Sequence, residues 1–229
     1  PSAVKGIAAI VDKAPLEVLK DQMILRSLDG LAEVLPAAIE NESFAFYGII
    51  LSGTAEQEPR WLRAVKFVSD ALRDEVGKEY SARYFPPSYK AEMNEMVANM
   101  VAAMRERIDR LEWMQPHTKA RAKEKLKGLS GRAGYPDKWR EYDSLEMKAD
   151  DRFGNRLRAS RFDFRYTMDR ASEPVRRWEW FFGAQTVNAN ANYNLLQLTF
   201  PAAFLQPPVF DPAADPAINY GAIGAVAAH

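Results

Sequence analysis

The ionisable side chains are distributed very unevenly along this chain, and this distribution limits how it can fold. Residues 186–229 contain only two charged side chains, Asp211 and Asp215, whereas the first 185 residues contain the other 60. A segment with so little charge is best accommodated inside protein. Because five prolines interrupt it, it cannot form the continuous apolar helix of about 20 residues that spans a membrane. We therefore place a boundary near residue 185 and expect a buried segment after it.

The overall composition excludes several classes of protein. The 31 basic and 31 acidic side chains give zero net charge, which argues against a nucleic-acid partner, and the basic run from Lys119 to Lys127 is better interpreted as a solvated helix. The absence of cysteine excludes disulfides, thiolate catalysis and cysteine-based zinc fingers. A metal site would need His, Asp or Glu, and the two histidines are His117 and His229. We expect no membrane segment in this chain.

Apolar residues recur at helical spacing through the first half of the chain. They predict helices over residues 15–35, 37–51, 59–80 and 93–111. In the last of these, methionines and aliphatic residues form one continuous stripe from Met93 to Leu111. Such a stripe could line a ligand groove, but core packing is the more common arrangement, and we expect it here.

The low-charge segment shows a different pattern. Residues 195–200 predict a short strand that ends at Pro201. Asp215 and Pro216 then predict the start of a helix that continues to His229. The small residues of this helix suggest a central, buried position. Taken alone, the terminal His229 is more typical of a frayed end than of a metal ligand.

Several short segments occur in a specific order. They are residues 60–61 (Arg-Trp), Gly77, Tyr80, Phe85, residues 113–114 (Trp-Met), 134–137 (Gly-Tyr-Pro-Asp), 187–189 (Val-Asn-Ala), 200–208 and 219–226, the last just before His229. From about residue 40 onward, this series resembles the neprilysin-like zinc metallopeptidases. That family includes neprilysin, the endothelin-converting enzymes and bacterial oligopeptidases.

The resemblance implies a fold and a division into domains. The expected fold class is predominantly α, or α+β with a small sheet. A helical lobe would occupy residues 1–142, followed by a connecting helical segment over residues 143–185. Residues 186–229 would begin a zincin-like catalytic module that contains the substrate-edge strand and an incomplete zinc-binding helix.

The resemblance also implies a cofactor, one zinc ion in the complete protein. In this family the last helix continues into H-E-x-x-H, whose two histidines bind zinc while the Glu acts as general base toward a zinc-bound water. His229 matches the first histidine, and the remaining catalytic groups are expected beyond residue 229. We therefore expect this chain alone neither to bind zinc tightly nor to cleave peptides. Its partners would be a peptide substrate and the remainder of the catalytic domain, supplied by the same protein or by a second chain.

Substrate contacts are implied as well. Asn188 and Ala189 match positions that hydrogen-bond the substrate main chain in the manner of an added strand. A pocket for a large hydrophobic residue after the scissile bond maps onto Phe204, Val209, Ala225 and Val226. Without the resemblance, a turn-capping role for Asn188 and ordinary core roles for the other residues would be the simpler interpretation.

The sequence also departs from the family pattern. Residues 190–191 (Asn-Ala) stand where an aromatic pair is usual, and Leu196 stands where Asn is usual. The alternative function is therefore a non-catalytic helical binding or scaffold protein that retains the family architecture. Because animal members resembling this chain are rich in cysteine, its cysteine-free sequence favours a bacterial origin. An extracytoplasmic location, periplasmic or secreted, is expected, although some bacterial relatives stay in the cytoplasm.

Overall fold

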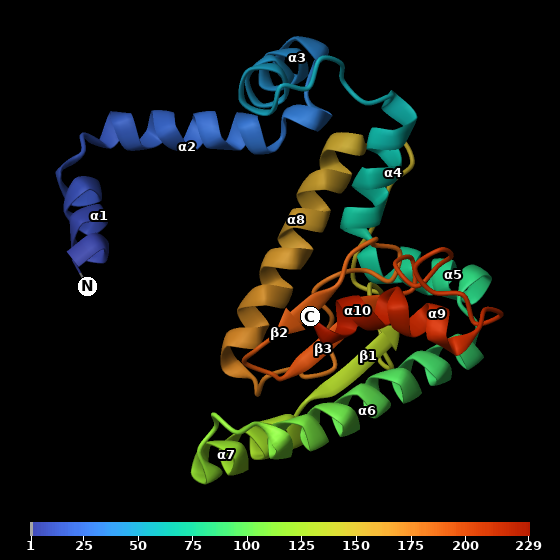
Figure 1. Cartoon of the computed structure of the whole chain (residues 1–229). Helices are drawn as coiled ribbons and strands as arrows, with labels where there is room; N and C mark the ends of the chain where they lie inside the picture. Colours follow the sequence, from blue (N-terminus) through green and yellow to red (C-terminus); the bar gives the residue numbers. More distant parts are fainter. Residues whose placement is uncertain (1) are drawn as a thin grey trace. The chain divides into compact units, whose positions relative to one another are not determined.

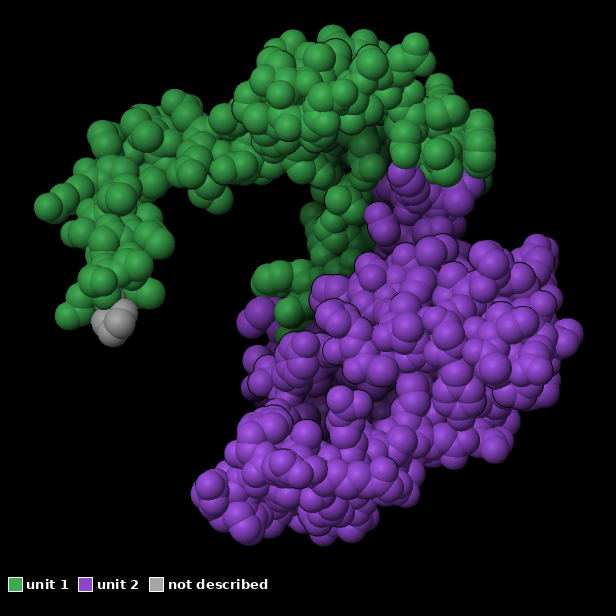
Figure 2. Space-filling model, in the orientation of Figure 1, with its two compact units in different colours: residues 1–64, 143–167 green, residues 65–142, 168–229 purple. Residues whose placement is uncertain are grey.

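The computed structural model describes residues 2–229, which form two compact units (Figure 2). The first unit contains the described residues up to 64 and residues 143–167, and the second contains residues 65–142 and 168–229. Helices α4 (Arg60–Ala71) and α8 (Arg152–Asp169) each contribute residues to both units. Residues 65–142 thus belong to the same compact unit as the low-charge segment. The predicted helical lobe over residues 1–142 and the connecting segment over residues 143–185 stay predictions. The catalytic module predicted from residue 186 onward stays a prediction.

The first unit is helical. Besides most of α8 it contains α1 (Ser2–Lys13), α2 (Leu16–Gly30), the 3-10 turn η1 (Ala32–Val34), α3 (Ala37–Ser43) and the π-helix η2 (Phe44–Leu51) (Figure 1). Pro15 and Pro36 directly precede α2 and α3, where the fixed φ of proline favours a helix start. The helix predicted over residues 37–51 is present as α3 and η2 together, and its geometry changes from α to π at Phe44.

The second unit combines helices with a small sheet. Its further helical elements are α5 (Arg73–Tyr84), α6 (Pro87–Arg110), α7 (Pro116–Lys127), η3 (Arg170–Ser172), α9 (Pro216–Gly221) and α10 (Ile223–Ala228). Its strands are β1 (Ser130–Gly134), β2 (Asn190–Asn192) and β3 (Gln197–Pro201). The predicted fold class, mainly α with a small sheet, is confirmed. No helix among residues 2–229 is both long enough and apolar enough to cross a membrane.

The central strand of the sheet is β3. It pairs with β1 in parallel, with Arg132 opposite Thr199, and with β2 in antiparallel fashion, with Asn190 opposite the same Thr199. Strand β2 is therefore an edge strand within the described sheet. The strand predicted over residues 195–200 begins two residues later than expected and includes Pro201.

The core of the second unit lies where α6 packs against β1. Met93, Met96 and Val97 of α6 are buried there, in agreement with the predicted core role of the stripe. A Cβ atom at Gly131 would lie 2.7 Å from Cγ1 of Val97, so the close approach of β1 to α6 requires glycine at this position. The stripe is less buried toward its C-terminal end, where Met104 is 42% exposed.

The helix predicted over residues 59–80 is interrupted. Leu72 has φ −121° and ψ 43°, and it separates α4 from α5. Just after this break, the amide of Asp74 donates to the hydroxyl of Tyr142, and the buried carboxylate of Asp74 accepts from the amide of Arg140. These tertiary bonds hold the chain at the interruption, and the expectation of one continuous helix was wrong.

The terminal helix is also interrupted, at Ala222, whose φ of −92° and ψ of −93° separate α9 from α10. Gly221 and Gly224 flank the break and lower the helix propensity there. The predicted start is confirmed, because the carboxylate of Asp215 caps α9 by accepting from the amide of Ala217 at 2.8 Å. The expected buried position applies to only some residues of this helix, such as Ile223 and Gly224, whereas Ala225 and Val226 are exposed.

Candidate substrate and zinc site

His229 lies directly after α10 and is exposed. Its amide donates to the carbonyl of Ala225 at 3.2 Å, so its backbone continues the helical hydrogen-bonding pattern. The imidazole is therefore presented from the end of a helix. The family resemblance implies such a helical setting for the first histidine of a zinc-binding motif, and the role of His229 as a ligand stays a prediction.

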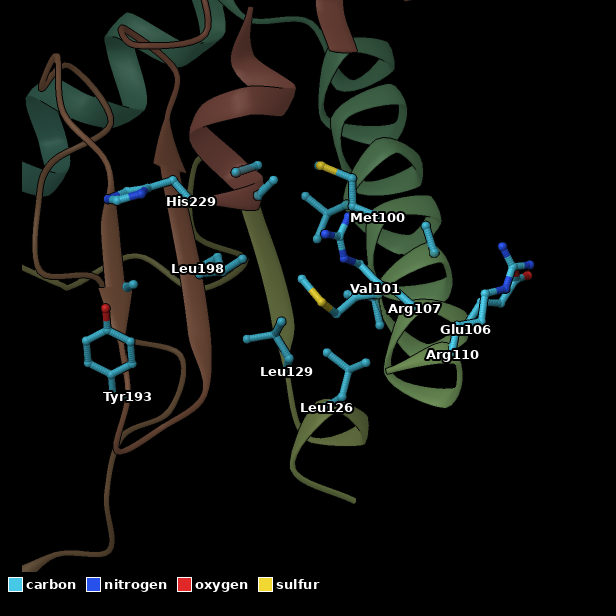
Figure 3. Close-up of a pocket in the computed structure, with 16 residues that line it drawn as sticks. Met100, Val101, Glu106, Arg107, Arg110, Leu126, Leu129, Tyr193, Leu198 and His229 are labelled. Carbon is cyan, nitrogen blue, oxygen red and sulfur yellow. The ribbon is translucent and has the colours of Figure 1, made fainter. Parts of the chain in front are cut away.

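His229 also borders a cavity of about 630 Å³ within the second unit (Figure 3). The C-terminal half of the apolar stripe forms one wall, where Met100 and Val101 face Leu198 of β3. His229 lies on the side of the cavity that also contains Tyr193, the residue that follows β2. The stripe thus combines the two roles considered for it, packing the core at one end and lining a cavity at the other.

The residues present do not complete a zinc site. No group of three His, Asp or Glu side chains that could hold a metal ion occurs within residues 2–229. His117 is exposed in the first turn of α7, where Nε2 of its ring lies 3.2 Å from the hydroxyl of Thr118. His229 is therefore a candidate for one ligand, and a metal centre would need donors from outside these residues.

Asn188 and Ala189 immediately precede the edge strand β2. Asn188 is exposed, and its side-chain oxygen accepts from the amide of Ala189 at 2.8 Å. Ala189 is partly buried against the core of the second unit. This is a suitable place for a peptide that adds to the sheet as a further strand, because an edge strand presents unpaired backbone groups.

The four residues predicted to line a side-chain pocket lie in two settings. Phe204 and Val209 are partly buried and pack against the core of the second unit. Ala225 and Val226 are exposed on α10. None of the four lines the cavity beside His229. The pocket that the resemblance implies for them therefore stays a prediction.

One polar residue that the sequence did not single out lies in the middle of β1, and its side chain bonds to the central strand β3. Arg132 of β1 donates from Nη2 to the hydroxyl of Thr199 at 2.9 Å and from Nη1 to the carbonyl oxygens of Arg177 and Glu179 at 3.0 and 2.9 Å. Burial lowers the pKa of its guanidinium, and the nearby charge of Arg177 lowers it further. Strand β1 contains two glycines and no apolar alternation, so no strand pattern marks it in the sequence.

Comparison of the sequence with known protein families identifies the family. Two sequence models of peptidase family M13 match the chain, one over residues 1–136 and the other over residues 188–229. The second match covers β2, β3, α9, α10 and His229. The chain belongs to peptidase family M13.

Individual relatives agree with this assignment. Human neprilysin is 30% identical over 100% of the chain, and the neutral endopeptidase of Lactobacillus helveticus is 29% identical over 96% of it. The inhibitor-bound crystal structure of the zinc metalloprotease Zmp1 of Mycobacterium tuberculosis superposes on 97% of the chain with a TM-score of 0.90 and 39% identity. The chain spans about a third of each relative, namely 32%, 34% and 33% of their lengths.

Proposed function

We propose that this chain is part of a zinc-dependent metallopeptidase that hydrolyses peptide bonds in oligopeptides. The observation that supports this most directly is the family match over residues 188–229, which ends on the histidine presented from the end of α10. In the intact protein, zinc would polarise the scissile carbonyl and activate water. His229 would supply one ligand, and the other ligands and the general base would come from the remainder of the catalytic domain.

Within this proposal, the edge strand β2 recruits the substrate. Asn188 and Ala189 would bond the peptide main chain beside β2, so that the substrate extends the sheet. Phe204, Val209, Ala225 and Val226 would favour a large hydrophobic residue after the scissile bond. A size-limited cavity would restrict substrates to oligopeptides. The 229-residue chain by itself would be inactive, because residues 2–229 contain no group of three His, Asp or Glu side chains that could hold a zinc ion.

The intact protein should cleave a short quenched peptide with a large hydrophobic residue after the scissile bond, and a chelator should abolish the cleavage. His229→Gln should remove both activity and bound zinc, measured by atomic emission after dialysis. The matched control His117→Gln should retain both, because this exposed histidine lies in α7. If zinc and activity persist in His229→Gln, the proposed role of His229 is wrong.

The alternative, a non-catalytic binding or scaffold protein, predicts a different outcome. The departures at residues 190–191 and at Leu196 favour it, because they change the edge that would contact substrate. Such a protein would bind peptides without cleaving them, whether or not a chelator is present. In the parent protein, the enzyme interpretation further requires Glu-x-x-His directly after His229.

The cellular location belongs to the same proposal. Relatives from Mycobacterium tuberculosis and Lactobacillus helveticus support a bacterial origin. We propose that the intact protein acts outside the cytoplasm, in the periplasm or as a secreted protein. Cell fractionation with an antibody against residues 2–229 would test this, and recovery in the cytoplasmic fraction alone would contradict it.

A further inference from the structure

Arg132 links three parts of the second unit with one side chain. From the middle of β1 it reaches the hydroxyl of Thr199 on β3 through both Nε and Nη2, at 3.2 and 2.9 Å. Its Nη1 donates to the carbonyl oxygens of Arg177 and Glu179. The guanidinium also lies over the ring of Trp180, 5.4 Å from the ring centroid. All of these acceptors are neutral, so the planar fork of Arg132 fixes geometry without neutralising a carboxylate.

The segment that Arg132 holds is connected in turn to the hairpin of β2 and β3. Residues 177–180 belong to no helix or strand, so side chains must fix their position. The carbonyl of Arg177 also accepts from the side chain of Gln197, the first residue of β3, at 3.0 Å. In the other direction, Nη2 of Arg177 donates to the carbonyl of Leu195 at 2.8 Å, inside the turn that joins β2 to β3.

The strand register continues this link to the edge of the sheet. Arg132 is directly opposite Thr199, and Thr199 is directly opposite Asn190 of β2. Residues opposite each other in neighbouring strands direct their side chains to the same face. Arg132 is therefore connected to β2 in two ways. The first is the cross-strand row Arg132–Thr199–Asn190, and the second is the contact with Arg177, which bonds to the turn after β2. Asn188 and Ala189 lie directly before this strand.

We propose that Arg132 is a positioning residue for the substrate-binding edge of the sheet, a role that presupposes the peptidase function proposed above. It contacts no substrate. It holds Thr199 and residues 177–179 so that β2 presents its free edge in one register. Because α10 and His229 are outside its contacts, loss of Arg132 weakens peptide binding and leaves the chemical step nearly unchanged.

Two variants test the two ends of this link in the intact protein. Arg132→Lys keeps the charge but cannot reach all three acceptors, and Arg177→Gln removes the donor to the turn. Both should raise KM for a quenched peptide about tenfold, the effect of losing one charge-assisted hydrogen bond, and change kcat by less than about twofold. Zinc content should stay at the wild-type level. The matched control is Arg176→Gln, since Arg176 forms an ion pair with Glu173 instead, and it should leave KM unchanged.

Amide hydrogen exchange of the same variants gives a readout that does not depend on activity. Exchange should accelerate at residues 190–196 in both variants and remain at the wild-type rate in α6. An unchanged KM in both variants would overturn the proposal, as would exchange that accelerates throughout the second unit or a fall in kcat that follows zinc loss. If the wild-type protein cleaves no peptide, the proposed function fails, and local exchange at residues 190–196 still decides whether Arg132 holds the edge.

Discussion

Leu196 has a backbone conformation that few residues of its type adopt. Its φ of +52° lies in the left-handed region, where a Cβ atom crowds the backbone. It is the last residue of the turn between β2 and β3, and its carbonyl accepts from the amide of Ser130 at 2.9 Å. The side chain of Asn192 closes the same turn by accepting from the amides of Asn194 and Leu195. The Asn usual in the family at position 196 would suit this φ better.

We therefore expect Leu196→Asn to stabilise the protein by about 1 kcal/mol, because Asn tolerates the left-handed region at lower cost. Urea unfolding followed by circular dichroism would measure the change. Leu195→Asn is the matched control, since Leu195 has no positive φ, and it should not be stabilising. Equal effects of the two substitutions would show that φ is not the cause.

At the scale of the element, the first turn of α8 is stabilised by Asp151, the residue directly before the helix. The carboxylate of Asp151 accepts from the amide of Gly154 at 2.8 Å and from Nη1 of Arg158 at 3.0 Å. Both contacts favour the ionised form, so the pKa of Asp151 lies below its ordinary value of 3.8, with the Gly154 amide as the largest cause. A pKa that is lower in the folded state means that the unfolded state binds the proton more tightly. The stabilisation is therefore complete above pH 3.8 and is lost as the pH falls through the folded-state pKa.

Asp151→Asn should remove the contribution of this carboxylate to the pH dependence of the free energy of unfolding. Relative to wild type, the variant should be less stable near neutral pH, and the difference should shrink as the pH falls from about 5 to about 2. Urea titrations at a series of pH values would measure it. Asp150→Asn removes the neighbouring exposed carboxylate and serves as control. A constant difference in the free energy of unfolding between Asp151→Asn and wild type over this range would show that Asp151 does not cause the pH dependence of stability.

At the scale of the whole molecule, the proposed zinc site draws on more than this chain. The described residues supply one candidate ligand, His229, and a catalytic zinc site usually has three protein ligands. The purified 229-residue polypeptide should therefore retain less than one zinc per chain after dialysis and should not cleave a quenched peptide. The intact protein, assayed in parallel, is the positive control. Stoichiometric zinc in the short polypeptide would contradict this prediction.

Sequence patterns predicted the helices and helix starts that neighbouring residues in the sequence determine. Proline positions predicted the starts of α2, α3 and α9, and the apolar stripe predicted α6 and its buried face. They missed the features that arise from long-range contacts. The breaks at Leu72 and Ala222 interrupt periodic segments that read as continuous helices, and β1 has no strand signal of its own.

The candidate site divides in the same way. The order of short motifs indicated the family, and with it the roles proposed for His229, Asn188 and Ala189. The sequence did not indicate Arg132, because its importance comes from acceptors 45, 47 and 67 residues away along the chain. For the stripe on α6, the sequence favoured core packing over a groove, whereas its C-terminal end lines a cavity.

The sequence by itself determined the family, the helical character and the low-charge segment that carries β2, β3 and His229, because periodicity, proline positions and motif order are local properties of the chain. The tertiary structure alone decided which strands pair, where helices break and which side chains hold the edge of the sheet. These depend on contacts between residues far apart in sequence, such as Arg132 with Thr199 and Asp74 with Tyr142.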